Sequence, residues 1–280
     1  FRYSRDGDRF DYVIGLFAFH QDLTTTGTQQ QGAAASRWLI NPSNALSNDP
    51  SVLDGLTAYN NIDFKNTSLA AFGQLTWNVT DRLRIQPGLR VNYDYKSGTY
   101  DRTVFDGNGD PVLFGQTGAV RAAQLAVLSP QYFEATFSDW NLSYDLTLSY
   151  DLAPDVMAYA TYARAFRSGG INLNGLPNDA NNAPILAAAT VDPEKVNHYE
   201  IGLKTQLLDR RAVLNVTGFW TDISDYQANV VNGQVGVLRG YLANADRVRV
   251  RGVEVEFSIR PSARFSAYAN GAYTDHAYVR

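Results

Sequence analysis

The residues best suited to hold a solute lie in one stretch, YATYARAFRSGGINLN, at positions 159–174. Arg164 and Arg167 follow an aromatic, strand-like run, and a guanidinium can bind a carboxylate, a phosphate or a catecholate-type group through two parallel hydrogen bonds. Asn172 and Asn174 come after a Gly-Gly pair, which lets the chain turn sharply away from the strand. We predict that Arg164, Arg167, Asn172 and Asn174 line a ligand-binding site where this strand ends. In the alternative interpretation, the arginines pair with acidic residues on adjacent strands.

The other reactive side chains do not form a recognisable catalytic or metal site. The sequence DGNGDP at 106–111 has the Asp-x-Asn-x-Asp spacing of a calcium loop, but it lacks the turn glycine and the bidentate glutamate, so a plain turn is expected. His20, His198 and His276 have no metal-ligand spacing and are expected in the lumen or at the rim of a barrel. Cysteine is absent, and no Ser-His-Asp set, activated carboxylate pair or phosphate loop is found. We therefore expect no catalytic residue, no metal, no cofactor and no enzyme activity.

Long strands are the elements that would position these residues. Over 83–95 the odd positions are apolar or aromatic and most even positions are charged or polar, and the same alternation returns over 140–152 and 197–207. Globular strands average ~5–6 residues, whereas a tilted membrane-spanning strand needs ~9–11. The alternating runs are long enough to favour membrane strands. Over 248–259 the pattern changes phase, as a bulge or emergence from the bilayer would produce.

Connections between the expected strands are alternately short and long. Short ones occur near 79–82, 153–155, 208–211 and 260–263, and long polar ones cover 22–67, 98–136, 168–194 and 225–246. This order is typical of an antiparallel up-and-down outer-membrane barrel, with periplasmic turns and outer loops. We expect an all-β fold of about nine strands, plus the tail of another before the turn at 5–8. A soluble sandwich is the alternative.

The side chains of these strands are expected to sort onto two faces. Some aromatic residues would form girdles at the membrane interfaces, and the charged residues of the opposite face would point into the lumen and pair there. The girdle candidates are Trp77, Tyr93, Tyr95, Tyr150 and Trp220, and the lumenal charges are Arg84, Arg90, Asp94, Asp145, Asp151, Glu200, Lys204, Glu254 and Glu256. No run of ~18–20 apolar residues could form a spanning helix. The net charge of −4 argues against a nucleic-acid partner.

Several strand sequences resemble TonB-dependent outer-membrane receptors. YATYARAFRSGGINLN, DPEKVNHYEIGLKTQLLDRRAVLNVTGFWTDISDYQ and NADRVRVRGVEVEF resemble, in this order and spacing, the C-terminal half of the receptor barrel. RFDYVIGLFAFHQD and LRIQPGLRVNYDY resemble earlier strands of that barrel. The resemblance implies that residues 1–280 are part of a 22-stranded, plugged transmembrane β-barrel, without the plug domain and the last strands.

The resemblance also implies a function in the bacterial outer membrane. It implies an active transporter that takes up a scarce solute, such as a ferric siderophore, a cobalamin-like compound or an oligosaccharide. Gating would be driven by the proton-motive force through the TonB complex, which contacts the missing plug. Outer-membrane lipid and lipopolysaccharide are further expected partners, and lipopolysaccharide phosphates are another way to satisfy Arg164 and Arg167. A passive porin and an adhesin remain alternatives.

Overall fold

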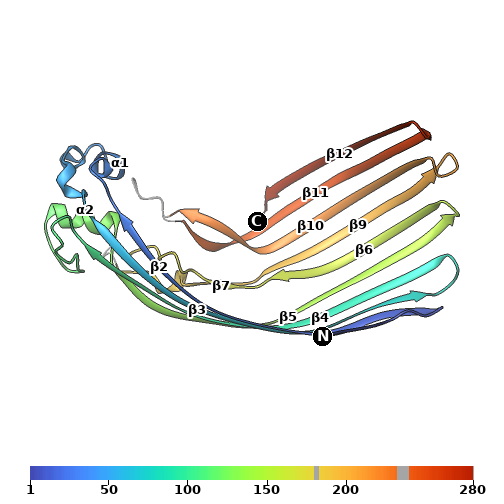
Figure 1. The fold of residues 1–280 in the computed structure, drawn as a ribbon, viewed down its shortest axis with the longest axis horizontal. Coiled ribbons are helices and arrows are strands. Elements are labelled where there is room, and N and C mark those ends of the chain that lie inside the picture. Colours follow the sequence, from blue (N-terminus) through green and yellow to red (C-terminus); the bar gives the residue numbers. More distant parts are fainter. Residues whose placement is uncertain (180–182, 232–239, 280) are drawn as a thin grey trace.

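A computed structural model describes residues 1–179, 183–231 and 240–279 and contains one large antiparallel sheet. The sheet has ten strands, each hydrogen-bonded to its neighbours along the chain (Figure 1). They are β1 (Arg2–Arg5), β2 (Phe10–Gln30), β3 (Thr57–Asn78), β4 (Leu83–Phe105), β5 (Gln131–Ala153), β6 (Val156–Arg167), β9 (Glu194–Leu207), β10 (Ala212–Val231), β11 (Gly240–Ser262) and β12 (Phe265–Tyr278). The predicted up-and-down order of nine strands and the tail of another is confirmed.

The sheet curves into an open trough and is not closed into a barrel within the described residues (Figure 1). Tight turns lie at one end, where β3, β5, β9 and β11 lead into the next strand, and the longer connections and the helices lie at the other end. These connections contain the short elements α1 (Ala35–Leu39), η1 (Ala45–Asn48), η2 (Pro50–Val52), α2 (Ala119–Val127), β7 (Gly170–Ile171), η3 (Leu186–Ala188) and β8 (Thr190–Val191). The predicted separation of turns from loops is therefore confirmed.

The strands are much longer than the alternation indicated. β3 has 22 residues and β4 has 23, about twice the ~9–11 residues that a tilted membrane-spanning strand needs. Much of the predicted loops 22–67 and 98–136 is therefore strand, and the middle of 225–246 lies outside the described residues. Backbone pairing continues beyond the apolar band, where the strict alternation of apolar and polar residues disappears.

Strand register separates the two faces of the trough. Residues directly opposite each other in an antiparallel pair lie on the same face, and Leu16, Ala71, Val91 and Leu142 follow one another across β2 to β5. Leu16 is 62% exposed and Leu142 is 49% exposed, so this convex face is apolar and uncovered. All the predicted girdle residues lie on it, including Trp77 against Phe10 and Tyr93 against Trp140.

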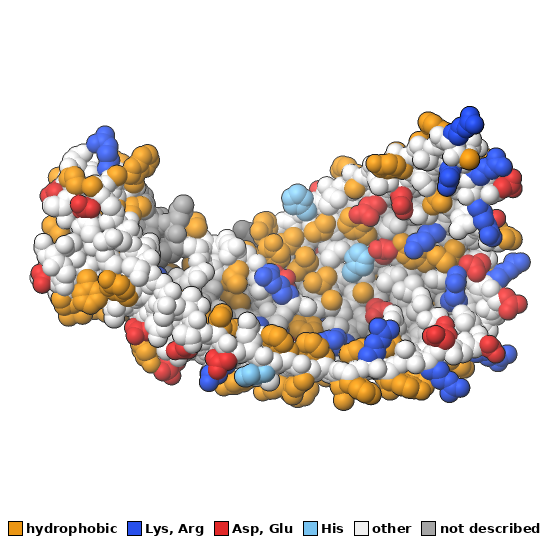
Figure 2. Space-filling model, in the orientation of Figure 1, with side chains coloured by type: hydrophobic (Ala, Val, Ile, Leu, Met, Phe, Trp, Pro, Cys, Tyr) orange, Lys and Arg blue, Asp and Glu red, His pale blue; other side chains and the backbone are white. Residues whose placement is uncertain are grey.

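The concave face carries the predicted lumenal charges, and several of them pair with neighbouring strands, whereas one buried carboxylate oxygen of Asp94 has no hydrogen-bond partner among the described residues. Arg84 contacts Asp151 at 3.1 Å, and the ammonium of Lys204 lies 5.2 Å from the centre of the Tyr159 ring. Glu256 accepts a hydrogen bond of 2.9 Å from the Asn215 amide. Figure 2 shows acidic and basic side chains scattered over this face, with hydrophobic side chains gathered along the lower edge of the trough.

The change of phase in β11 does not come from a bulge. The strand keeps an unbroken register with β10 and β12 from Val248 to Ile259. The convex positions simply change in type, from Val253 and Val255 to Arg251 and Arg249. The emergence interpretation fits this change, whereas the bulge interpretation is wrong.

Candidate functional site

The connection between β6 and β9 folds back into the trough. Leu173 and Leu176 of this inner segment (168–179 and 183–193) pack against Tyr100 of β4 and Phe133 of β5, and Leu176, Tyr100 and Phe133 are at most 3% exposed. Leu173 lies over Gly98, where an added Cβ would be 3.0 Å from a leucine methyl group. The inner segment therefore covers the concave wall at the loop end of the sheet.

Buried side-chain amides fix the inner segment to strands on both sides of the trough. An amide side chain can donate and accept at once, so it pairs with a backbone unit as another peptide group would. Gln131 of β5 donates to the Leu176 carbonyl at 2.8 Å and accepts from the Leu176 N–H at 2.9 Å. Gln227 of β10 donates to the carbonyls of Ser168 and Asp192, at 3.1 and 3.0 Å. The segment is thus held at its two ends and near its middle.

Asn172 links the inner segment to β11. Its amide nitrogen donates to the carbonyl oxygens of Ala188 at 2.7 Å and Leu242 at 2.9 Å, and its oxygen accepts from the Leu242 N–H at 2.9 Å. Its exposed fraction is only 7%. Asn172 therefore joins Ala188 of the inner segment to Leu242 of β11, and we call this set of hydrogen bonds the clamp.

A lysine and a glycine fix the point where the inner segment leaves β6. The ammonium of Lys96 donates to the Ser168 hydroxyl at 3.0 Å and to the Gly169 carbonyl, and it lies 5.8 Å from the centre of the Phe137 ring. A Cβ at Gly169 would overlap the Phe137 ring and the Val191 carbonyl oxygen. The second residue of the Ser-Gly-Gly sequence must therefore be glycine for this close approach.

A buried cation lies on the concave wall near the inner segment. The Arg102 guanidinium is stacked 5.3 Å from the centre of the Tyr100 ring and donates to the Asn60 side-chain oxygen at 2.7 Å. Burial is the main cause that lowers the pKa of Arg102. The aromatic face and the amide oxygen partly replace the water that the guanidinium has lost.

The structure separates the two predicted ligand-binding arginines. Arg164 lies opposite Asn197 on the convex face, and Arg167 lies opposite Glu194 on the concave face, because residues three apart in a strand point to opposite sides. The Arg167 guanidinium is 3.5 Å from the Glu194 carboxylate and its side chain is 60% exposed. Asn172 is the buried clamp, and Asn174 is exposed. No observation tests solute binding by these residues, which stays a prediction.

Sequence reasoning missed Lys96, Gln131 and Gln227. Gln131 and Gln227 are 1% and 6% exposed, yet in the sequence they look like ordinary polar residues of the predicted loops 98–136 and 225–246. Their partners are 35 to 59 residues away along the chain, so no local spacing could reveal them. Lys96 carried a usable signal, because it continues the even-numbered polar face of 83–95 into an aromatic neighbourhood.

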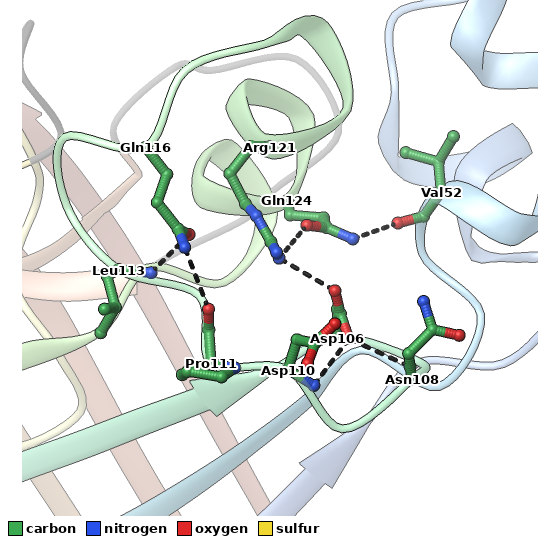
Figure 3. A network of polar contacts seen from close by, with 9 residues as sticks. All are labelled: Val52, Asp106, Asn108, Asp110, Pro111, Leu113, Gln116, Arg121 and Gln124. Carbon is green, nitrogen blue, oxygen red and sulfur yellow. Dashed lines mark hydrogen bonds and ion pairs between the residues drawn. The ribbon is translucent and has the colours of Figure 1, made fainter.

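A second folded unit caps the loop end of β2 to β5. Val52, Leu53 and Leu56 from 31–56 share a buried core with Val112 and Leu125 from 106–130. In Figure 3, the polar side chains beside this core form a network in which the guanidinium of Arg121 contacts Asp106 at 3.1 Å and the Gln124 oxygen at 2.8 Å. Gln124 in turn donates to the Val52 carbonyl at 3.0 Å. The two connections therefore fold as one cap.

The sequence at 106–111 forms a turn within this cap. The first oxygen of the Asp106 carboxylate accepts from the N–H groups of Asn108 and Asp110, each at 3.0 Å, and the second binds Arg121. The expected plain turn is confirmed. Within the described ranges, no three His, Cys, Asp or Glu side chains are grouped so that they could hold a metal ion.

The histidines lie on both faces of the sheet. His198 and His276 belong to the concave face, where the His198 ring contacts Thr221 at 2.8 Å and Glu200 at 3.2 Å. His20 lies on the convex face and contacts the Thr67 hydroxyl at 2.9 Å. The expected lumenal placement is thus right for His198 and His276.

No helix among the described residues is long and apolar enough to cross a membrane.

Comparison with known proteins gives one consistent result. The family model described as "TonB dependent receptor-like, beta-barrel" matches residues 1–280. The chain is 29% identical over 204 residues to the pesticin receptor of Yersinia enterocolitica, covering 73% of this chain and 25% of the relative. It is 30% identical over 151 residues to the probable TonB-dependent receptor BfrD of Bordetella pertussis, covering 54% of this chain and 19% of the relative. The chain thus spans about a quarter of the length of the pesticin receptor.

Solved structures of siderophore receptors share the fold. The ferric yersiniabactin uptake receptor FyuA from Yersinia pestis superposes with a TM-score of 0.69 at 20% identity, over 99% of this chain and 34% of that one. The siderophore receptor PiuA from Acinetobacter baumannii superposes with a TM-score of 0.62 at 15% identity, over 98% of this chain and 37% of that one. At such identities, the superpositions establish the strand arrangement.

Proposed function

Because this chain belongs to the TonB dependent receptor-like β-barrel family, we propose that it forms part of the wall of an active transporter that takes up a ferric siderophore. Members of the family are transporters of the bacterial outer membrane, so the convex face contacts lipid and the concave face borders the lumen. The tight turns are then periplasmic and the inner segment and the cap are extracellular. Uptake would be gated by a plug coupled to the TonB complex and driven by the proton-motive force.

The observation that carries the choice of solute is an exposed and weakly paired guanidinium, that of Arg167, on the concave wall near the extracellular end. Arg167 is 60% exposed there and is only loosely paired with Glu194, at 3.5 Å. The Glu194 oxygen is already engaged, because it accepts from the Gln227 N–H at 2.6 Å. An exposed guanidinium whose carboxylate partner is already engaged can donate hydrogen bonds to an anionic ligand, such as a ferric complex with catecholate or carboxylate groups. Solved structures with this fold include two siderophore receptors.

The test is uptake by the full-length receptor in a Gram-negative host that lacks its own siderophore receptors. We expect radioactive iron to accumulate from a ferric siderophore in a host with TonB and not in a host without it. The variant Arg167→Gln should reduce uptake at low ligand concentration by about tenfold, the cost of losing one charge-assisted contact of roughly 1.4 kcal/mol. Arg264→Gln, in a periplasmic turn, removes the same charge and should leave uptake unchanged.

Other outcomes would identify the alternative functions. Uptake that is equal with and without TonB would indicate a passive porin and would contradict active transport. Cobalamin or oligosaccharide uptake without iron uptake would keep the transport mechanism and replace the solute. The Asn- and Gln-rich composition of 22–67 would fit such a neutral, polar solute. Ligand binding without any uptake would favour an adhesin.

A further inference from the structure

Leu176 of the inner segment fills an apolar pocket in the concave wall. Its side chain is buried against Tyr100 and Phe133, whose stacked rings have their centres 5.2 Å apart. Ile62 and Ala135 pack at the edge of the same cluster. These four residues belong to β3, β4 and β5, so the wall supplies this side of the pocket by itself. We call it the Leu176 pocket.

The wall also binds the backbone of Leu176. The buried Gln131 side chain accepts from the Leu176 N–H at 2.9 Å and donates to the Leu176 carbonyl at 2.8 Å. One amide side chain thus satisfies both backbone groups of one residue, as a neighbouring strand would. Main-chain hydrogen bonds combined with a pocket for a side chain are the way in which receptors bind extended peptides. The inner segment therefore sits on the wall as a bound peptide would.

A positive charge beside the pocket has no partner of opposite sign. Arg102 is only 8% exposed, and in the described part of the chain its guanidinium forms no salt bridge. Its Nη2 atom lies 3.4 Å from the position that a Cβ of Gly175 would take. Buried charges in proteins are normally paired. The inner segment thus fills the pocket and leaves the charge beside it uncompensated.

We propose that this part of the wall binds an anionic, peptide-like ligand, and that residues 175–176 occupy the site in its absence. Such a ligand offers an apolar side chain to the Leu176 pocket, an amide group to Gln131 and a carboxylate to Arg102. The carboxylate lies on the N-terminal side of the apolar group, because Gly175 is the residue beside Arg102. The site goes beyond iron uptake, because it does not use Arg167 and does not depend on the choice of a ferric siderophore.

The ligand has to compete with the inner segment. A tethered segment acts at a high effective concentration, and the apparent dissociation constant of the ligand increases as the open fraction of the segment decreases. The ligand has one advantage over the segment, because its carboxylate forms charge-assisted hydrogen bonds with Arg102. Loosening the clamp at Asn172 should therefore strengthen binding without changing any group that contacts the ligand.

The experiment measures binding to the purified full-length receptor by isothermal titration calorimetry. The probes are N-succinyl-leucinamide and N-butyryl-leucinamide, in which a methyl group replaces the carboxylate. In the Asn172→Ala receptor the succinyl probe should bind about tenfold more tightly than the butyryl probe. The wild type should bind both probes more weakly, in the same proportion. Adding Arg102→Gln to Asn172→Ala should abolish the preference for the succinyl probe.

The ratio of the two affinities within one variant is the quantity that matters, because a change in the opening of the inner segment affects both probes equally. The matched control is Arg37→Gln in the Asn172→Ala receptor, which removes an exposed arginine from the cap and should keep the preference. Arg102→Lys retains the charge and should keep part of it. Heat-modifiable migration on a gel reports whether each barrel has folded.

Three results would overturn the proposal. The first is equal affinity of the two probes, or no binding of either, in the folded Asn172→Ala receptor. The second is a preference for the succinyl probe that survives Arg102→Gln, because another cation would then bind the carboxylate. The third is equal affinity of the wild type and Asn172→Ala for the succinyl probe, because the ligand would then bind without displacing the inner segment.

Discussion

Replacing Asn172 with alanine tests whether the inner segment is held by the clamp. The substitution removes a side chain that is 7% exposed and that makes hydrogen bonds to the Ala188 carbonyl and to both backbone groups of Leu242. Among the described residues, no other side chain of the inner segment bonds to Leu242, so the alanine variant leaves that peptide group without its partner. The inner segment should then open more often.

The size of the effect follows from the number of bonds. A neutral hydrogen bond contributes ~1 kcal/mol net, and a buried group left without a partner costs about as much or more. Loss of the bonds to Ala188 and Leu242 should therefore lower the free energy of local opening by roughly 3 kcal/mol. Since ~1.4 kcal/mol corresponds to a factor of ten, local opening should become at least about 100-fold more frequent.

The assay is amide hydrogen exchange on the full-length receptor. The Leu242 amide should exchange about 100-fold faster in Asn172→Ala than in the wild type, while the central, membrane-level part of β5 should keep its protection. Asn174→Ala is the matched control, because Asn174 is the same residue type two positions away and is exposed. Equal protection of Leu242 in the Asn172→Ala variant and the wild type would refute the clamp.

Two further substitutions test the cap and the exit from β6. Leu53→Ala should destabilise the cap by ~2–5 kcal/mol, because Leu53 is 0% exposed; limited proteolysis should cut 31–56 faster, and Leu113→Ala, at a 53% exposed residue, should not change the rate. Gly169→Ala should increase exchange throughout the inner segment, because its methyl group would overlap Phe137, whereas a Cβ at Gly170 meets nothing closer than 3.8 Å. If Gly170→Ala had the larger effect, the packing argument would be wrong.

The sequence predicts the membrane-level strands well because lipid on one side and the lumen on the other impose a period of two. Leu89 and Val91 face lipid and Arg90 faces the lumen, and that difference is visible in the sequence alone. Beyond the belt, water lies on both sides, so residues such as Thr24, Thr25 and Thr26 continue β2 without any alternation. The sequence therefore predicts loops where the ends of these strands in fact continue.

The candidate site was predictable only in part. The three-residue spacing of Arg164 and Arg167 already requires opposite faces once they belong to one strand, so their separation could have been inferred. The role of Asn172 could not, because its partner Leu242 is 70 residues away. A buried amide that pairs with a distant backbone unit looks, in the sequence, like any polar loop residue.

The contacts that hold the inner segment are different from those that hold the sheet. The ladder from β1 to β12 is continuous without the inner segment, whereas Gln131, Asn172 and Gln227 join that segment to strands that are not all neighbours in the sheet. Losing one amide therefore changes a local opening equilibrium and leaves the backbone pairing of the wall intact. It follows that mutations that loosen the inner segment should cost the sheet itself little stability.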